Sequence, residues 1–231
     1  MKKPYTDIHL QKYADVFVNF ALDVQPNKSV LLNVPESASD LLPFLYESVL
    51  KAGAHPIVNF RPEGLSNKFF AIANDKQLEF FPEKTMLSRL EETDYLISII
   101  ADSDPTELSD VDPKKLALLR KASGFYSQAY KNKMDITPNF WTLGMFGTQG
   151  MADLAGLSLD EYWEQIIEAC FLNEDDPKAC FEDIFSQIAN VKKWLNSLDI
   201  DYMHIQAEDT DLTVGLGENR QWLGGSGRNI P

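Results

Sequence analysis

The sequence predicts an α/β protein in which a mostly parallel sheet is flanked by helices and followed by the start of a second domain. Short apolar runs of strand length alternate with longer segments whose apolar residues recur every three or four positions. Strands that are separated by helices need crossover connections, so a parallel, right-handed sheet is the expected topology. After Leu198 the apolar period changes from helical to alternating, and we place the domains at 1–198 and 199–231.

The first two thirds of the chain predict the elements of that sheet. In chain order they are helix 7–24, strand 29–34, helix 41–52, strand 55–60, helices 66–73 and 82–91, strand 94–101, helix 113–121 and strand 139–146. Three of these helices begin at residues that favour N-caps, namely Thr6 or Asp7, Ser39 or Asp40, and Asp112 before Pro113. Gly53 ends the second helix, where a left-handed residue is wanted.

The last third predicts two amphipathic helices and a hairpin. The helices cover 158–170, with Ser158 as cap, and 177–198, with Pro177 in the first turn. Residues 202–206 and 210–216 alternate polar and apolar side chains, which predicts two short strands. Because a two-stranded hairpin is marginal in water by itself, we expect that the chain stops inside the second domain.

Composition limits the classes of partner. Twenty-one Lys plus Arg against thirty-five Asp plus Glu gives 21 − 35 = −14, and such an acidic surface repels nucleic acid and anionic membranes. No apolar run approaches the roughly twenty residues that span a bilayer. Asp7, His9 and Gln11 interrupt the apolar segment that a signal peptide needs, so we expect a cytoplasmic protein. Its two cysteines, Cys170 and Cys180, are then expected to be reduced.

The tail carries the most specific pattern in the chain. Residues 210–216 read TDLTVGL, Arg220 and Trp222 follow, and residues 224–231 read GGSGRNIP. This tail resembles the segment that leads into the active site of the aminopeptidase T and aminopeptidase S family of thermophilic metallo-aminopeptidases. The resemblance extends over essentially the whole chain and fits only the amino-terminal part of that family.

The resemblance implies a two-metal enzyme that removes single residues from peptide N-termini. The full-length enzyme would use two divalent ions, zinc, cobalt or magnesium, act on peptides, and form a homodimer that encloses its active sites. In that family the first glutamate ligand follows the Asn-x-Pro step by a few residues, and this sequence stops at Pro231. No metal, catalytic or cofactor residue of the family therefore has a match here, and we expect the isolated chain to bind no catalytic metal and to be inactive.

One local pattern could carry other chemistry. Residues 102–106, DSDPT, follow a predicted strand and match the DxDxT pattern of magnesium-dependent phosphatases, in which the first Asp is the nucleophile. The position at the carboxyl end of a strand suits a site. The alternative is a turn in which Asp and Ser side chains accept backbone N–H groups before Pro105. Glu36, Arg61 and Glu63 also follow strands and have equally ordinary explanations as loop residues.

The remaining motifs predict no site. His9, His55 and His204 lack partners at the spacing of metal ligands. Arg220 and Ile230 stand where the third glycine of a dinucleotide-binding pattern belongs, after Gly215-x-Gly217 and Gly225-x-Gly227. A further hypothesis is a non-catalytic α/β module for binding or dimerisation, whose exposed tail docks a partner.

Overall fold

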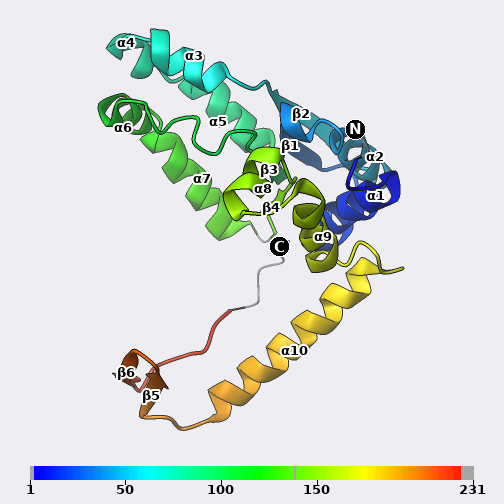
Figure 1. The fold of residues 1–231 in the computed structure, drawn as a ribbon, viewed down its shortest axis with the longest axis vertical. Coiled ribbons are helices and arrows are strands. Elements are labelled where there is room, and N and C mark those ends of the chain that lie inside the picture. Colours follow the sequence, from blue (N-terminus) through cyan, green and yellow to red (C-terminus); the bar gives the residue numbers. More distant parts are fainter. Residues whose placement is uncertain (1–2, 138, 225–231) are drawn as a thin grey trace. The chain divides into compact units, whose positions relative to one another are not determined.

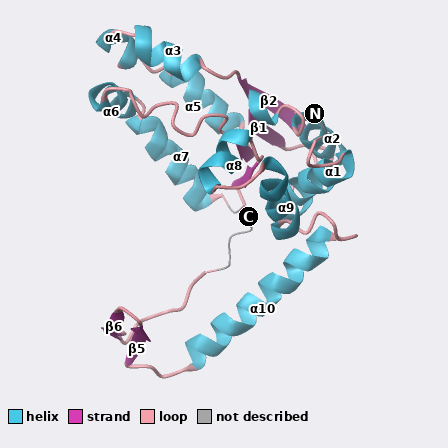
Figure 2. Cartoon of the chain, viewed as in Figure 1, coloured by secondary structure: helices cyan, strands magenta, loops and turns pink. Residues whose placement is uncertain are grey.

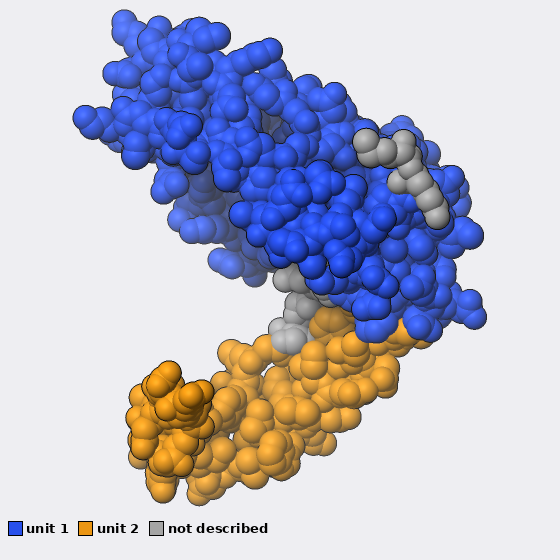
Figure 3. Space-filling view, viewed as in Figure 1, with its two compact units in different colours: residues 1–177, 228–231 blue, residues 178–227 orange. Residues whose placement is uncertain are grey.

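The chain divides into two compact units in the computed structural model, which describes residues 3–137 and 139–224 (Figures 1 and 3). The first unit contains the described residues up to Pro177, and the second begins at Lys178. The division between the units precedes the last long helix, whereas the change of apolar period at Leu198 follows it. The domain boundary at 198 therefore stays a prediction.

A four-stranded parallel sheet forms the centre of the first unit. Its strands lie in the order β2-β1-β3-β4, and all three neighbouring pairs are parallel (Figure 2). The strands are β1 (Ser29–Pro35), β2 (His55–Arg61), β3 (Tyr95–Ile100) and β4 (Trp141–Met145). The predicted α/β class with a mostly parallel sheet is confirmed, and the four predicted strands agree with the observed ones to within two residues at each end.

One face of the sheet is covered by the helices at the start of the chain (Figure 1). These are α1 (Asp7–Asp15), the π-helical turn η1 (Val16–Ala21) and α2 (Leu42–Lys51). On β4, a Cβ atom built at Gly144 would lie 2.1 Å from Cζ of Phe17. Glycine at this position therefore allows η1 to lie directly against the sheet.

The predicted helix 7–24 is divided into α1 and η1. The Leu22 N–H donates to the Phe17 carbonyl at 3.1 Å, which is an i to i−5 bond. Tyr13, in the turn before, donates its hydroxyl to the Met145 carbonyl at 2.9 Å and accepts the Met145 N–H at 3.1 Å. Apolar spacing does not reveal one extra residue in a turn, so the sequence predicted a single α-helix here.

The other face is covered by α5 (Glu83–Glu92) and α7 (Gly124–Ile136) (Figure 1). A buried cluster joins these helices to the sheet, and it consists of Leu31, Leu90, Leu96 and Phe140. Side chains of α7 pack against that cluster, namely Tyr126, Ala129, Tyr130 and Met134. The sequence analysis predicted α5 but no helix over 124–136.

Three further helices form a small cluster of their own within the first unit. They are α3 (Leu65–Ile72), α4 (Asp75–Leu78) and α6 (Pro113–Ala122), and their buried side chains are Phe70, Ala73 and Leu78. The Asp112 side chain accepts the Lys114 N–H at 2.9 Å, so the predicted cap of α6 is confirmed.

Caps explain most of the helix ends. Thr6 caps α1, and Ser158 forms a capping box with Glu161 at the start of α9 (Leu159–Ala169), as predicted. Gly53 adopts a left-handed conformation with φ of 73°. The predicted cap at Ser39 or Asp40 is wrong, because α2 begins after Leu41 with no side-chain cap. The short helix α8 (Gln149–Ala155) was not predicted.

The second unit contains one long helix and one hairpin. They are α10 (Pro177–Ser197) and the antiparallel strands β5 (Tyr202–Ala207) and β6 (Thr210–Gly215), so the predicted hairpin is confirmed. Large apolar side chains of this unit are exposed, including Val191, Trp194 and Leu212. The glycine-rich tail 225–231 lies outside the described residues. No helix in the described ranges combines the length and the apolarity that crossing a bilayer requires.

Candidate functional site

The carboxyl ends of the four parallel strands meet at one edge of the sheet. β2 and β3 flank β1 on opposite sides, so the strand order reverses between β1 and β3. Open α/β sheets bind ligands in the crevice outside such a point. The polar residues that follow the strands here are Glu36 and Ser37, Arg61 and Glu63, Asp102 and Ser103, and Thr148.

Hydrogen bonds join the loops after β1, β2 and β3. The Glu36 carboxylate accepts the Glu63 N–H at 3.0 Å, and the Ser103 hydroxyl donates to the Glu63 carboxylate. The Ser37 hydroxyl, in the 3₁₀ turn η2 (Glu36–Ala38), donates to the Ala101 carbonyl. Both hydroxyls therefore fix loops. The Glu63 carboxylate accepts the Ser103 hydroxyl, the Ala101 carbonyl accepts the Ser37 hydroxyl, and the Glu36 carboxylate accepts the Glu63 N–H.

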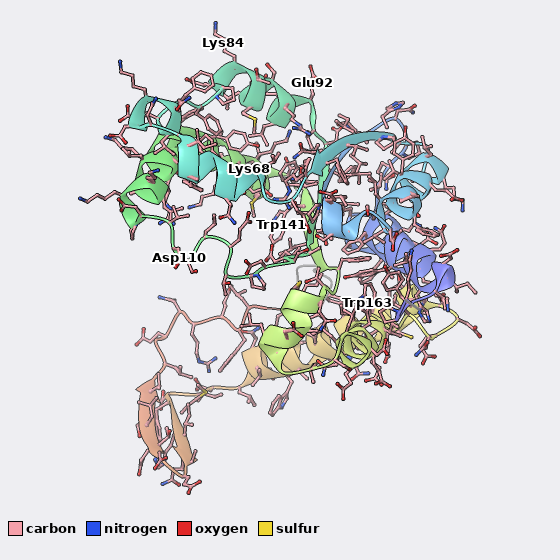
Figure 4. The ribbon with its side chains drawn as sticks, turned by 45° about the horizontal axis from the view of Figure 1, so that its top comes forward. Lys68, Lys84, Glu92, Asp110, Trp141 and Trp163 are labelled. Atoms are coloured by element: carbon pink, nitrogen blue, oxygen red, sulfur yellow. The ribbon has the colours of Figure 1, made fainter. Side chains whose placement is uncertain are left out.

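A cavity of about 450 Å³ lies beside these loops. Three aromatic rings line it, with centroids of Tyr5 and Trp163 4.3 Å apart and those of Phe146 and Trp163 4.9 Å apart. Trp163, which is labelled in Figure 4, is fully buried on α9, and its indole N–H donates to the Gly147 carbonyl at 3.0 Å. The indole of this aromatic wall is thus fixed by a backbone hydrogen bond, and the sequence analysis did not single out the three rings as a site.

A second cavity, of about 440 Å³, lies on the β2 and β3 side of the same edge. Its lining includes Arg61 and four carboxylates, those of Glu63, Asp102, Asp104 and Glu107. The edge as a whole therefore presents hydrogen-bond acceptors and negative charge, which suits donors and cations rather than phosphate groups.

The DSDPT loop is held as a turn. Asp104 Oδ1 accepts the Thr106 N–H at 2.9 Å and the Thr106 hydroxyl at 2.6 Å, and these bonds lower the pKa of the exposed Asp104 carboxyl. The Thr148 hydroxyl donates to the Asp102 carbonyl at 2.5 Å. A Cβ built at Gly150 would lie 2.1 Å from the Ser103 carbonyl oxygen, so α8 presses on the loop. This geometry supports the turn interpretation of residues 102–106.

Asp40 anchors the N-terminal segment near the first cavity. It accepts the Tyr5 hydroxyl and pairs with Lys3 Nζ, each at 2.6 Å. The hydrogen bond from Lys3, followed by that from Tyr5, lowers the pKa of Asp40, whereas burial and then Asp40 raise the pKa of Tyr5. Asp40 is therefore a tether for residues 3–5 and not the helix cap that the sequence predicted.

The three histidines lie in three separate places. His9 Nδ1 accepts the Thr6 N–H in the capping box of α1. His55 begins β2, and its N–H donates to the Lys28 carbonyl. His204 Nε2 lies 2.6 Å from Asp211 Oδ1 on the exposed hairpin. His9 and His204 thus have local side-chain partners, and His9 and His55 stand in different elements of the first unit.

The described residues do not fit a two-metal centre. Across 3–137 and 139–224, no three His, Cys, Asp or Glu side chains come together in a way that could hold a metal ion. The carboxylates at the sheet edge accept N–H and O–H groups, as shown above for Glu36, Glu63 and Asp104. The cysteines are thiols: Cys170 is buried, and burial raises its pKa to about 12, while Cys180 is half-buried.

The first of the two glycine patterns, Gly215-x-Gly217, lies at the end of the hairpin in the second unit. Gly215 ends β6, and Arg220 lies where a dinucleotide-binding pattern would need its third glycine. The Arg220 guanidinium donates to the Leu198 carbonyl at 2.9 Å, which satisfies a group just after α10. The second pattern, Gly225-x-Gly227, falls outside the described residues.

Known proteins resemble this chain over nearly its whole length. It is 26% identical to "Aminopeptidase 2" of Geobacillus stearothermophilus over 227 residues, covering 94% of this chain and 55% of that protein. It is 27% identical to "Aminopeptidase T" of Thermus thermophilus over 231 residues, covering 94% of this chain and 56% of that protein. The chain thus spans about half the length of the curated relatives it matches.

A solved structure has the same fold. "Wild-type AmpT from Thermus thermophilus" matches 96% of this chain and 59% of its own, with a TM-score of 0.75 and 25% sequence identity. The family model described as "Thermophilic metalloprotease (M29)" matches residues 6–231. Since that match covers nearly all of the sequence, the chain belongs to the thermophilic metalloprotease family M29.

Proposed function

We propose that this chain is the amino-terminal part of a two-metal-dependent aminopeptidase that removes residues from the N-termini of peptides. The observation that carries the proposal is the family match over residues 6–231, together with relatives that are named aminopeptidases. The matched region covers 55% and 56% of those two relatives, so each is nearly twice as long as the region it shares with this chain.

Residues 1–231 serve as scaffold in this proposal. We assign no catalytic step to them, because the described residues offer no set of metal ligands. The two divalent ions, zinc, cobalt or magnesium, would be held by residues that this sequence does not contain, and the isolated chain would be inactive. The acidic sheet edge and the aromatic cavity would shape the region that peptides approach.

The domain organisation belongs to the same proposal. Residues 1–198 form the amino-terminal α/β domain, and 199–231 begin the catalytic domain. Exposed apolar side chains after residue 198 support this, since Tyr202, Ile205 and Leu212 are 63%, 44% and 49% exposed. Side chains of this kind normally find a partner surface. The whole enzyme would be a cytoplasmic homodimer.

The nucleotide sequence beyond the codon for Pro231 tests the proposal. We expect an open reading frame that continues for nearly as many codons again, with a glutamate within the first few. The longer product should hydrolyse an aminoacyl chromogenic substrate when cobalt or zinc is added. A stop codon directly after Pro231 would favour the non-catalytic module, in which the tail docks a partner.

A further inference from the structure

Three neighbouring strands carry a polar side chain at the same level of the sheet. Asn33 of β1 is in register with Asn59 of β2 on one side and with Ser98 of β3 on the other. Asn33 lies on the face of β1 that also carries Leu31, which is the face covered by α5 and α7. Central strands of a covered parallel sheet are normally apolar throughout. All three side chains of the row are half-buried, so the row is a polar interruption of this face that a ligand or solvent can reach.

Arg89 of α5 fixes the direction of the hydrogen bonds along this row. A guanidinium group only donates, and Arg89 Nη1 lies 3.3 Å from Asn59 Oδ1. The Asn59 amide then donates to Asn33 Oδ1 at 2.8 Å, and the Asn33 amide donates to Ser98 Oγ at 3.3 Å. The side-chain oxygens of Asn33 and Asn59 each accept one hydrogen bond. The side chains of Asn33, Asn59 and Arg89 each keep further N–H groups that these bonds do not use. The row therefore offers spare donors.

A cavity of about 500 Å³ opens over one end of the row. Asn33 and Ser98 belong to its lining, and Tyr126 and Tyr130 of α7 form part of the wall. The other apolar lining residues are Leu31, Leu90, Leu96, Met134 and Phe140. A cavity of this size with a mostly apolar wall and a few polar groups has the character of a small-molecule site.

The charges around the cavity are positive, although the chain is acidic overall. Lys131 is the one charged residue among the described lining residues, and none of them is Asp or Glu. Arg89 lies close enough to the cavity that its charge offsets part of the rise that burial causes in the pKa of Tyr126. In the ranges that the structure describes, no carboxylate lies within ion-pairing distance of Arg89. In a protein of net charge −14, this setting selects an anion.

We propose that the cavity between α7 and the sheet binds a small monocarboxylate with an apolar body. The carboxylate accepts the spare N–H group of Asn33 and pairs with Lys131, both of which line the cavity. Arg89, which is hydrogen-bonded to Asn59 and is not itself a lining residue, adds positive charge nearby. The apolar body packs against the tyrosines of α7 and the leucines of the sheet. This inference is independent of the proposed peptidase activity, since it uses only residues of the first unit.

A free amino acid fits this cavity less well than its N-acyl derivative. Its ammonium group would lose water in a place that offers no carboxylate in return. N-acetylation removes that charge and keeps the carboxylate, so N-acetyl-L-phenylalanine is the suitable probe. Its amide, N-acetyl-L-phenylalaninamide, keeps the size and the ring and removes only the negative charge.

Isothermal titration of the 231-residue chain with these compounds tests the proposal without any mutation. We expect saturable one-to-one binding of N-acetyl-L-phenylalanine. The amide and free L-phenylalanine should each bind about tenfold or more weakly. The amide loses hydrogen bonds to a charged group, which are the stronger ones, and the free amino acid must desolvate its ammonium group. Absence of saturable binding of the acid, or equal binding of the amide, contradicts the proposal.

Two matched variants locate the site. Arg89→Gln keeps an amide that can donate to Asn59 and removes the charge, so we expect binding of the acid to weaken by about tenfold or more. Arg120→Gln removes an exposed arginine of α6 that makes no hydrogen bond to the row of Asn59, Asn33 and Ser98, and its affinity should equal that of the parent. Far-ultraviolet circular dichroism checks that both variants fold. Undiminished binding by a folded Arg89→Gln chain would overturn the assignment.

Discussion

The side-chain amide of Asn196 holds the backbone of Trp222 through both its oxygen and its nitrogen. The Trp222 N–H donates to Asn196 Oδ1 at 2.8 Å, and Asn196 Nδ2 donates to the Trp222 carbonyl at 3.0 Å. Two residues earlier, Arg220 donates to the Leu198 carbonyl. The chain thus leaves β6 and returns to the end of α10, where Asn196 and Arg220 fix it.

Asn196→Ala should release this segment. It removes two hydrogen bonds that each contribute about 1 kcal/mol, so we expect the exchange protection of the Trp222 amide to fall by about tenfold or more. Hydrogen exchange followed by NMR measures it. Asn132→Ala is the control, because Asn132 is an exposed amide of α7 that accepts a hydrogen bond from Gln128, and it should leave Trp222 unchanged. Equal Trp222 protection in the parent and Asn196→Ala chains would contradict this account of the second unit.

Gly144→Ala should destabilise the first unit. The added methyl would lie 2.1 Å from Cζ and 2.5 Å from Cε1 of Phe17, so the ring or η1 must move. Overpacking of this kind costs about 1–3 kcal/mol. Urea unfolding should show a lower midpoint than for the parent. Gly124→Ala is the control, since no atom lies within 4 Å of its added Cβ, and an unchanged midpoint for both variants would refute the tight contact.

The two cysteines should differ strongly in reactivity. Burial raises the pKa of Cys170 to about 12, so at pH 8 only roughly one part in ten thousand is thiolate, whereas Cys180 is half-buried. A thiol reagent such as iodoacetamide should therefore modify Cys180 first in the native chain. Peptide mapping by mass spectrometry identifies the modified residue. Equal labelling of both in folded protein would show that Cys170 is accessible.

Asp40 should make a small contribution to the free energy of unfolding, and this contribution should depend on pH. Its pKa is lowered in the folded chain, chiefly by Lys3 and then by Tyr5. The contribution is present above the unfolded pKa of about 3.9 and is lost as pH falls through the folded pKa. Asp40 is 38% exposed, so solvent screening keeps the effect small. Asp40→Asn should lower the urea midpoint at pH 7, and its difference from the parent should vanish well below pH 4.

Asp135→Asn provides the matched control for that series, because Asp135 is an exposed carboxylate of α7. Its urea midpoint should follow that of the parent at every pH. If the Asp40→Asn difference persisted unchanged at the acid end, ionisation of Asp40 would not be its source.

Apolar runs were sufficient to predict the sheet, and local chemistry was sufficient to predict three of the helix starts. β1 and β3 are nearly continuous apolar runs because both of their faces are covered. Thr6, Asp112 and Ser158 act as caps through contacts within three residues, which sequence shows directly. Asp40 has the same chemistry, but its partners Lys3 and Tyr5 are thirty-five or more residues away.

The helices that were not predicted depend on tertiary contacts. α7 carries Tyr126, Ala129, Tyr130 and Met134 at helical spacing, and packing on the sheet cluster stabilises these side chains in a helix. The π turn η1 depends on Gly144, which lies more than a hundred residues away. The polar row was visible in the sequence as Asn33 and Ser98, which interrupt apolar strands. Only the strand register shows that they are neighbours.

The central claim is that residues 1–231 belong to a two-metal aminopeptidase without supplying its metal ligands. The most direct test is to incubate the repurified 231-residue chain with cobalt or zinc, to measure bound metal by equilibrium dialysis, and to assay an aminoacyl chromogenic substrate. The account predicts no stoichiometric metal binding and no turnover. Tight binding of metal together with steady turnover that survives a second purification would contradict it.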